Sequence, residues 1–209
     1  MPIYDISQTI DDKIAVWPGD QKFRHRWSMR IEKGDSCNVS AVTMSAHTGT
    51  HLDAPYHFDD AGHDIGSLPL QLCVGQARVV AVPADEQRIS VQYLERLNWK
   101  GVERILFRTR SSETRGDRFE RDFVCLAEDG AEFLVAQGLL LVGTDAPSVD
   151  AYTSKTLRCH KILHVHGIAI LEGVRLVHIP PGDYELICLP LKFSGLDGSP
   201  VRAALRRPD

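Results

Sequence analysis

Alternating hydrophobic and polar residues predict a β-hairpin near the N-terminus. Between residues 23 and 31 the odd positions hold aromatic or apolar side chains and one histidine, whereas the even positions hold arginine or serine. A period of two is typical of a strand with one buried face. Gly34 and Asp35 have the chemistry of a turn, and residues 38–46 can form the returning strand. We therefore expect a hairpin whose apolar face is covered.

Apolar runs and helix-ending residues alternate along the rest of the chain. Five further strands are expected, at residues 77–82, 104–108, 139–142, 168–171 and 185–191. Ser90 is expected to cap a helix running to about residue 98, Asp129 to cap one that Gly138 ends, and residues 154–164 to form a third. This alternation indicates an α/β or α+β domain. Residues 110–122, rich in both charges, are expected to form a solvated loop, with a lid as the alternative.

Composition narrows the class of protein. The chain has 209 residues, 43% of them hydrophobic, and a net charge of −4, as in an ordinary globular protein. This length predicts one domain over residues 1–209, and the charge gives no reason to expect a nucleic acid or a membrane as partner. The N-terminus lacks a signal-like apolar run, and five widely spaced cysteines form no CxxC pair. We expect a cytoplasmic protein with reduced thiols.

Histidine is the residue whose placement carries chemical information. Four of the nine histidines lie within residues 47–63 and four within residues 160–178, with none between these groups. Residues 47–57 have the sequence His-Thr-Gly-Thr-His-Leu-Asp-Ala-Pro-Tyr-His. In an extended backbone His47, His51, Asp53 and His57 share one face, and in a helix His47 and His51 would also do so. Either geometry gathers the nitrogen and oxygen ligands that suit a divalent metal ion.

The first histidine group has two other interpretations. Histidines beside a turn are often surface or hydrogen-bonded residues, and His63, in an acidic loop, keeps that interpretation. The H-x-H-x-D-H motif of the metallo-β-lactamase superfamily would need histidines at positions 49 and 54. This chain has Gly49 and Ala54 there, so that motif is excluded.

The second group precedes a carboxylate at the end of an apolar strand. Glu172 ends the predicted strand, where a carboxylate is costly unless it is paired, exposed or bound to a metal. His160, His164 and His166 lie where the third predicted helix leads into that strand. His160 and His164 share a helix face, so periodicity does not choose between them as a partner of Glu172.

The eleven-residue motif resembles that of a known family. Residues 47–57 match the pattern H-x-G-T-H-x-D-x-P-x-H of the cyclase family of metal-dependent hydrolases. Within that family the chain resembles the bacterial kynurenine formamidases (arylformamidases). The supporting stretches are residues 16–20, 143–148, 169–173, 190–192 and 199–202. The resemblance implies an α/β fold, a single cyclase-like domain of the swivelling β/β/α type. That domain would have a mixed β-sheet or barrel-like core and flanking helices.

The resemblance also implies two divalent metal ions per subunit, usually zinc. His47, His51 and Asp53 would hold the first ion. Asp53 and Glu172 would bridge to the second ion, which His160 would also bind. The family spacing to Glu172, rather than periodicity, selects His160 over His164.

Function follows from the same resemblance. His57 would be the catalytic proton-transfer residue, and Trp17 would form part of the substrate pocket. The implied reaction is hydrolysis of N-formyl-L-kynurenine to L-kynurenine and formate in tryptophan degradation, by a homodimer. Three alternatives stay open: a family hydrolase of another amide such as isatin or a cyclic imide, a metal-binding module without turnover, and an iron oxygenase with a His/carboxylate face.

Overall fold

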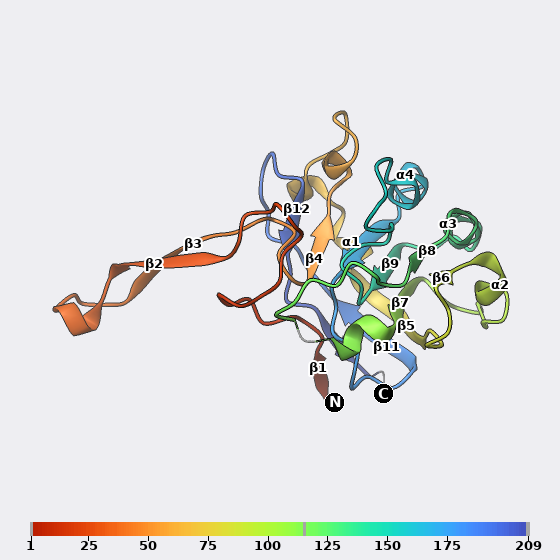
Figure 1. The fold of residues 1–209 in the computed structure, drawn as a ribbon, viewed down its shortest axis with the longest axis horizontal. Helices are drawn as coiled ribbons and strands as arrows, with labels where there is room; N and C mark the ends of the chain where they lie inside the picture. The colour runs from red at the N-terminus through yellow and green to blue at the C-terminus, as the bar shows by residue number, and fades with distance from the viewer. Residues whose placement is uncertain (1, 115, 208–209) are drawn as a thin grey trace.

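A nine-stranded mixed β-sheet lies at the centre of the computed structural model, which describes residues 2–114 and 116–207 (Figure 1). In order across the sheet, the strands are β1 (Ile3–Asp5), β13 (Ala204–Arg206), β11 (Gly182–Ile187), β5 (Val74–Ala81), β7 (Arg104–Arg108), β9 (Leu141–Thr144), β10 (Ala169–Glu172), β4 (His51–Asp53) and β12 (Gly198–Pro200). The four strands from β5 to β10 run parallel, and the outer strands pair antiparallel. The sheet curls into a half-barrel, which makes the fold mixed α/β, as the sequence implied.

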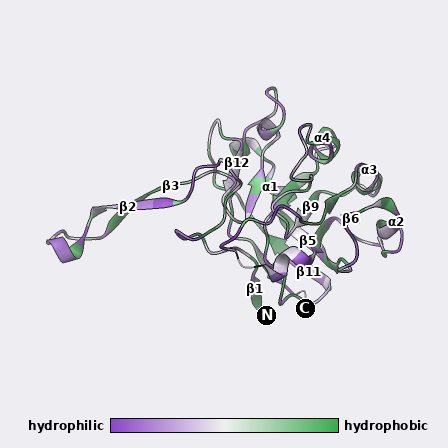
Figure 2. Cartoon of the chain, viewed as in Figure 1, coloured by the Kyte–Doolittle hydropathy of each residue, from purple (hydrophilic) through white to green (hydrophobic). Residues whose placement is uncertain are grey.

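The sheet separates two apolar cores because successive side chains of a strand point to opposite faces. On β7, Ile105 and Phe107 belong to the core beneath the helices, whereas Leu106 belongs to the opposite core. Burying one such side chain stabilises the fold by roughly 1.5–3 kcal/mol. The helices are α1 (Leu70–Cys73), α2 (Val91–Leu94), α3 (Glu128–Ala136) and α4 (Arg158–Val165). We call the nine-stranded sheet with these helices the body of the molecule, and Figure 2 shows that the hydrophobic colouring is concentrated in it.

Short elements complete the described chain. Two small sheets pair β2 (Arg24–Met29) with β3 (Val39–Thr43) and β6 (Arg88–Ile89) with β8 (Cys125–Leu126). The 3-10 turns are η1 (Ile31–Lys33), η2 (Pro55–His57), η3 (Ile65–Ser67) and η4 (Arg110–Glu113). None of the helices within residues 2–114 and 116–207 is long and apolar enough to cross a membrane. All five cysteines are free thiols, and all but Cys37 are buried.

The predicted strands are present, but all three helix predictions need correction. The five strands expected after the hairpin correspond to β5, β7, β9, β10 and β11. The helix after Ser90 is only four residues long, and the Ser90 side chain makes no capping bond. The chain tightens into short turns beyond Leu94, whose carbonyl accepts the indole N–H of Trp99. Asp129 lies inside the first turn of α3, where its charge suits the helix dipole, and Gly138 follows the helix at φ +71° as expected.

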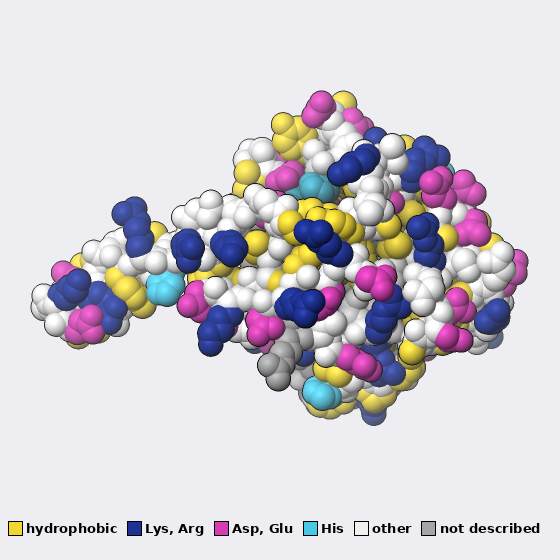
Figure 3. All heavy atoms as spheres, in the orientation of Figure 1, with side chains coloured by type: hydrophobic (Ala, Val, Ile, Leu, Met, Phe, Trp, Pro, Cys, Tyr) yellow, Lys and Arg dark blue, Asp and Glu magenta, His cyan; other side chains and the backbone are white. Residues whose placement is uncertain are grey.

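The predicted hairpin is present, but its apolar face is not covered within the chain. Strands β2 and β3 pair antiparallel and form an arm, residues 22–44, that projects from the body (Figure 1). Because no core reaches the arm, Trp27, Ile31 and Val42 are 46%, 59% and 58% exposed. Lysine and arginine side chains lie along the same arm (Figure 3). The prediction of a half-buried strand is therefore wrong for the isolated chain.

Candidate metal centre

Strand pairing brings the two histidine groups together at one end of the sheet. β4 carries His51 and Asp53, and it pairs with β10, whose last residue Glu172 lies opposite His51. Asp53 pairs with Gly198 of β12 on its other side. Residues 47–57 are therefore neither one strand nor one helix, because a turn precedes the three-residue strand and η2 follows it.

A close approach of two glycine backbones and the hydrogen bonds of one threonine hydroxyl set the conformation of this turn. Gly49 has φ +70° and Gly173 has φ +68°, a region that favours glycine. A Cβ on Gly173 would lie 2.5 Å from the carbonyl oxygen of Gly49, so the two backbones approach closely. The buried Thr50 hydroxyl donates to the Gly173 carbonyl at 2.7 Å and accepts from the Gln8 N–H at 2.9 Å. These contacts explain why glycine and threonine stand between the two first histidines.

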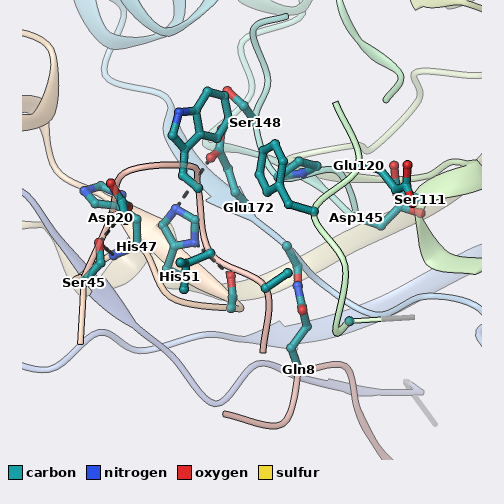
Figure 4. A pocket seen from close by; sticks show the side chains of 18 of the residues that line it. Gln8, Asp20, Ser45, His47, His51, Ser111, Glu120, Asp145, Ser148 and Glu172 are labelled. Carbon is teal, nitrogen blue, oxygen red and sulfur yellow. Dashed lines mark hydrogen bonds and ion pairs between the residues drawn. The ribbon is translucent and has the colours of Figure 1, made fainter. Parts of the chain in front are cut away.

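Two buried carboxylates and two buried imidazoles form the centre of the cluster. His51 Nε2 lies 3.4 Å from Asp53 Oδ1 and 3.5 Å from Glu172 Oε2. His160 Nε2 lies 3.4 Å from Asp53 Oδ2 and 3.3 Å from Glu172 Oε1. All four residues are at least 95% buried. Figure 4 shows His51 directed toward Glu172 and His47 beside it.

His47 and His57 lie on the more open side of the cluster. His47 Nδ1 is 3.0 Å from Asp53 Oδ1, and the rings of His47 and His57 are 4.1 Å apart at their centroids. His47, Asp53 and His57 offer ligand atoms within 4.8 Å of one another, as do His51, Asp53 and Glu172. The structure thus brings together all six histidine and carboxylate residues that the sequence singled out.

The remaining histidines of the two groups lie apart from the cluster. His63 is exposed. His164 Nε2 lies 3.7 Å from Asp59 Oδ2, and His166 Nδ1 donates to the carbonyl of Ile162 at 2.9 Å. The geometry therefore favours His160 over His164 as the partner of Glu172, a choice that periodicity had left open.

The hydrogen bonds behind the cluster suit a bound cation. His51 Nδ1–H donates to the Gly49 carbonyl at 3.0 Å, and His160 Nδ1–H donates to Asp150 Oδ2 at 2.7 Å. Both rings therefore direct Nε2 inward, as metal-ligating histidines do, and each Nε2 offers its lone pair once a metal ion displaces the proton there. Within the described residues, Asp53 Oδ2 is buried without a hydrogen-bond donor. A divalent cation between these atoms would satisfy the orphaned oxygen and both lone pairs.

Asp150 also sets where α4 begins. Its carboxylate accepts the backbone N–H groups of Cys159 and His160, each at 3.1 Å. These bonds satisfy the first free donors of the helix, which begins at Arg158 rather than at residue 154 as predicted. One carboxylate thus starts the helix and orients the imidazole that the helix presents.

Electrostatics of the cluster favour positive charge. Burial lowers the pKa of His51, but hydrogen bonds to Asp53 and Glu172 outweigh burial and raise it to about 10. Hydrogen bonds to Asp197 and Asp53 likewise outweigh burial and raise the pKa of His47 to about 9. The pKa of His160 is raised well above its ordinary value by hydrogen bonds to Asp150, Asp53 and Glu172. The carboxylates hold protons on these imidazoles, and a metal ion that binds here must displace them.

A cavity of about 580 Å³ opens onto the cluster. Trp17 and Phe119 line it and form an aromatic wall, with their ring centroids 5.2 Å apart. Tyr152 contacts Trp17 at the same centroid distance, 5.2 Å, but does not line the cavity. Several residues of the charged stretch 110–122 also line the cavity, among them Ser111 and Phe119. This stretch therefore borders the site, and it is more than a solvated loop. A flat apolar wall beside a polar floor suits an aromatic ring that carries a polar group.

Two carboxylates near the cluster were missed in the sequence. Asp150 contacts His160 as described, and Asp197 Oδ2 lies 3.0 Å from His47 Nε2 and 3.5 Å from His57 Nδ1. Asp150 lies just beyond one family-like stretch, and Asp197 precedes the Gly198-Ser199-Pro200 run that belongs partly to another. An Asp-Gly pair is a common turn signal, so its chemistry is not visible before the fold is known.

Known proteins share both the sequence and the fold. The model of the Cyclase family, described as "Putative cyclase", matches residues 4–151. The kynurenine formamidase of Bacillus thuringiensis (strain Al Hakam) is 47% identical over 202 residues, which cover 97% of this chain and 96% of the relative. A solved structure of a potential metal-dependent hydrolase with cyclase activity has a TM-score of 0.86, at 29% identity and 99% coverage of both chains. Isatin hydrolase A of Labrenzia aggregata shares the fold, with a TM-score of 0.82 at 24% identity, over 98% of this chain and 93% of that one. The chain belongs to the cyclase family, in the branch that contains the kynurenine formamidases.

Proposed function

We propose that this protein hydrolyses N-formyl-L-kynurenine to L-kynurenine and formate. The observation that carries the proposal is a buried His/Asp/Glu cluster at the floor of a cavity with an aromatic wall. An aryl formamide needs both parts, a site that activates water beside a carbonyl and a flat surface for the ring. The 47% identity to a kynurenine formamidase over nearly the whole chain supports this substrate.

The cluster has ligands for two metal ions, and zinc suits its imidazole and carboxylate groups. In this proposal His47, His51 and Asp53 hold one ion, whereas Asp53, His160 and Glu172 hold the other. Two bound zinc ions would act as Lewis acids on the formyl carbonyl and make water acidic enough to attack near neutral pH. Asp53 suits the shared position, since its two oxygens face His51 and His160 separately.

His57 is proposed to move the proton. Burial lowers its pKa, so the imidazole is neutral at neutral pH and can accept a proton. His57 takes the proton of the attacking water and delivers it to the aniline nitrogen as the C–N bond breaks. The water oxygen bonds to the formyl carbon, so the products are the free aryl amine and formic acid, which leaves as formate once its proton passes to solvent. Trp17 is proposed to hold the aryl ring during these steps, since its side chain lines the cavity.

A homodimer and a cytoplasmic location complete the proposal. The arm exposes Trp27 and Val42, and residues 22–44 contain five Lys or Arg against two acidic residues in a chain of net charge −4. A second copy of the acidic body would complement that arm in both charge and apolar surface. Light scattering after gel filtration should give the mass of a dimer for the wild-type protein and that of a monomer for Val42→Asp.

The proposed cytoplasmic location is supported by the thiols, because four buried free cysteines suit a reducing compartment.

The substrate proposal is tested by comparing two substrates and two histidine variants. The zinc-loaded protein should release formate from N-formyl-L-kynurenine with a kcat/KM at least about tenfold above that for isatin opening. His57→Ala should lose most turnover and keep its metal, whereas the exposed control His63→Ala should keep both. A preference for isatin would replace this substrate with the family alternative. Stoichiometric zinc binding without turnover of either compound would indicate a metal-binding module.

A further inference from the structure

Asp197 touches both histidines on the open side of the cluster. Its Oδ2 lies 3.0 Å from His47 Nε2 and 3.5 Å from His57 Nδ1, and its side chain is 42% exposed toward a cavity that it lines. A carboxylate only accepts hydrogen bonds, so both facing ring nitrogens must carry protons when these bonds form. One oxygen thus constrains two imidazoles to which we assign different roles.

The backbone around Asp197 holds this carboxylate in place. The Asp197 carbonyl accepts the N–H of Ala54, and the Leu196 carbonyl accepts the N–H of Ile65 at 3.0 Å. Asp64 Oδ2 accepts the N–H of Gly195 at 2.7 Å. Hydrogen bonds therefore attach residues 195–198 both to the residue that follows β4 and to the start of η3. The backbone from which the Asp197 side chain extends is thus held at a defined position relative to the two histidines.

The tautomer of His57 follows from this contact. A neutral imidazole carries one proton, and a bond from Nδ1–H to Asp197 leaves the lone pair on Nε2. We propose that Asp197 is a positioning residue that holds His57 in the Nδ1–H tautomer, with Nε2 free for proton transfer to and from the reacting amide. This inference rests on the proposed function, because it assigns Asp197 to the proton-transfer step of that reaction.

The contact with His47 predicts a separate effect. Donation of His47 Nε2–H to Asp197 leaves His47 Nδ1 facing Asp53 at 3.0 Å, on the side of the proposed ions. Loss of Asp197 should therefore weaken metal affinity through His47 and slow turnover through His57. Assays with excess zinc, with bound metal measured on the same sample, separate the two effects because the first is then saturated.

A double-mutant cycle tests whether Asp197 acts through His57. With zinc saturating, Asp197→Asn should lower kcat by roughly 10–100-fold while KM for N-formyl-L-kynurenine stays within about twofold. On the His57→Ala background, the same substitution should lower kcat by less than about twofold, because its target is gone. Equal losses on both backgrounds, or an unchanged kcat in the single variant, would overturn the proposal.

Asp64→Asn is the matched control for the segment itself. It weakens the hydrogen bond to Gly195 without touching either histidine, so its kcat should stay within about twofold of the wild type. If Asp64→Asn matches the loss of Asp197→Asn, the segment alone explains the effect and the proposal fails. Should Asp197→Asn not fold, Asp197→Ser gives the same comparison. A wild-type protein that releases no formate would instead refute the proposed function.

Discussion

Replacing Asp150 with alanine should weaken both the fold and one proposed metal site. The carboxylate accepts three hydrogen bonds, at 3.1 Å from Cys159 N–H, 3.1 Å from His160 N–H and 2.7 Å from His160 Nδ1–H. A hydrogen bond to a charged group contributes about 1.5–3 kcal/mol, and buried donors left without partners add to the loss. Since water can enter the space that the side chain leaves, we expect a loss of about 3–5 kcal/mol in the free energy of unfolding.

The loss at the metal site should be selective. Without Asp150 the His160 ring can rotate and change tautomer. Loss of a hydrogen-bond partner that orients a metal ligand typically lowers metal affinity by about 10–100-fold. Denaturant unfolding of the metal-free protein measures the loss of stability, and zinc titration against a competing chelator measures the loss of metal affinity. We expect one ion per chain to weaken and the other, assigned to His47 and His51, to bind almost as before.

Glu128→Ala is the matched control for the start of α4. Glu128 pairs with Arg158 at 3.3 Å on the exposed side of the same helix terminus, so its loss should cost no more than about 1 kcal/mol and leave both ions in place. If Asp150→Ala unfolds like this control and binds zinc like the wild type, the assignment of His160 as an oriented ligand is refuted.

Three further predictions concern substrate binding, protons and packing. Trp17→Ala should raise KM for N-formyl-L-kynurenine by roughly tenfold and change the bound zinc little, as steady-state kinetics and metal analysis would show. The pKa values of His51 and His47 are about 10 and about 9 in the fold and about 6.5 when unfolded, so between these values the metal-free protein binds more protons in its folded state. Its Tm should therefore fall as the pH is raised from 6.5 to 10. The Tm of the zinc-loaded protein should fall less over the same range. Gly198→Ala places a Cβ 2.9 Å from His47 Cε1, and calorimetry should show a loss of about 1–3 kcal/mol, with weaker zinc binding.

Contiguous sequence signals predicted the centre of the site. The spacing of His47, His51, Asp53 and His57 placed four groups within one short stretch, and the strand ending at Glu172 supplied the next carboxylate. These residues could be named because the local chain geometry, whichever form it took, keeps them close. Their separation into a turn, a three-residue strand and a 3-10 turn could not be predicted, since backbone contact between Gly49 and Gly173 sets it.

Long-range contacts account for what the sequence left undecided. His160 and His164 are equivalent by helical periodicity, and only the packing of α4 against β10 places His160 at Glu172. Asp150 and Asp197 belong to no periodic pattern, and their partners lie 10 and 140–150 residues away. The exposed arm was wrongly predicted to be covered because a period of two reports an apolar face but not whether the same chain buries it.

Zinc titration of the chelated protein, with bound metal and formate release measured on each sample, tests the central claim most directly. The account predicts that the metal-free protein releases no formate from N-formyl-L-kynurenine, and that activity returns as occupancy rises to two ions per chain. Full activity in the metal-free protein, or no activity with both sites filled, would contradict it.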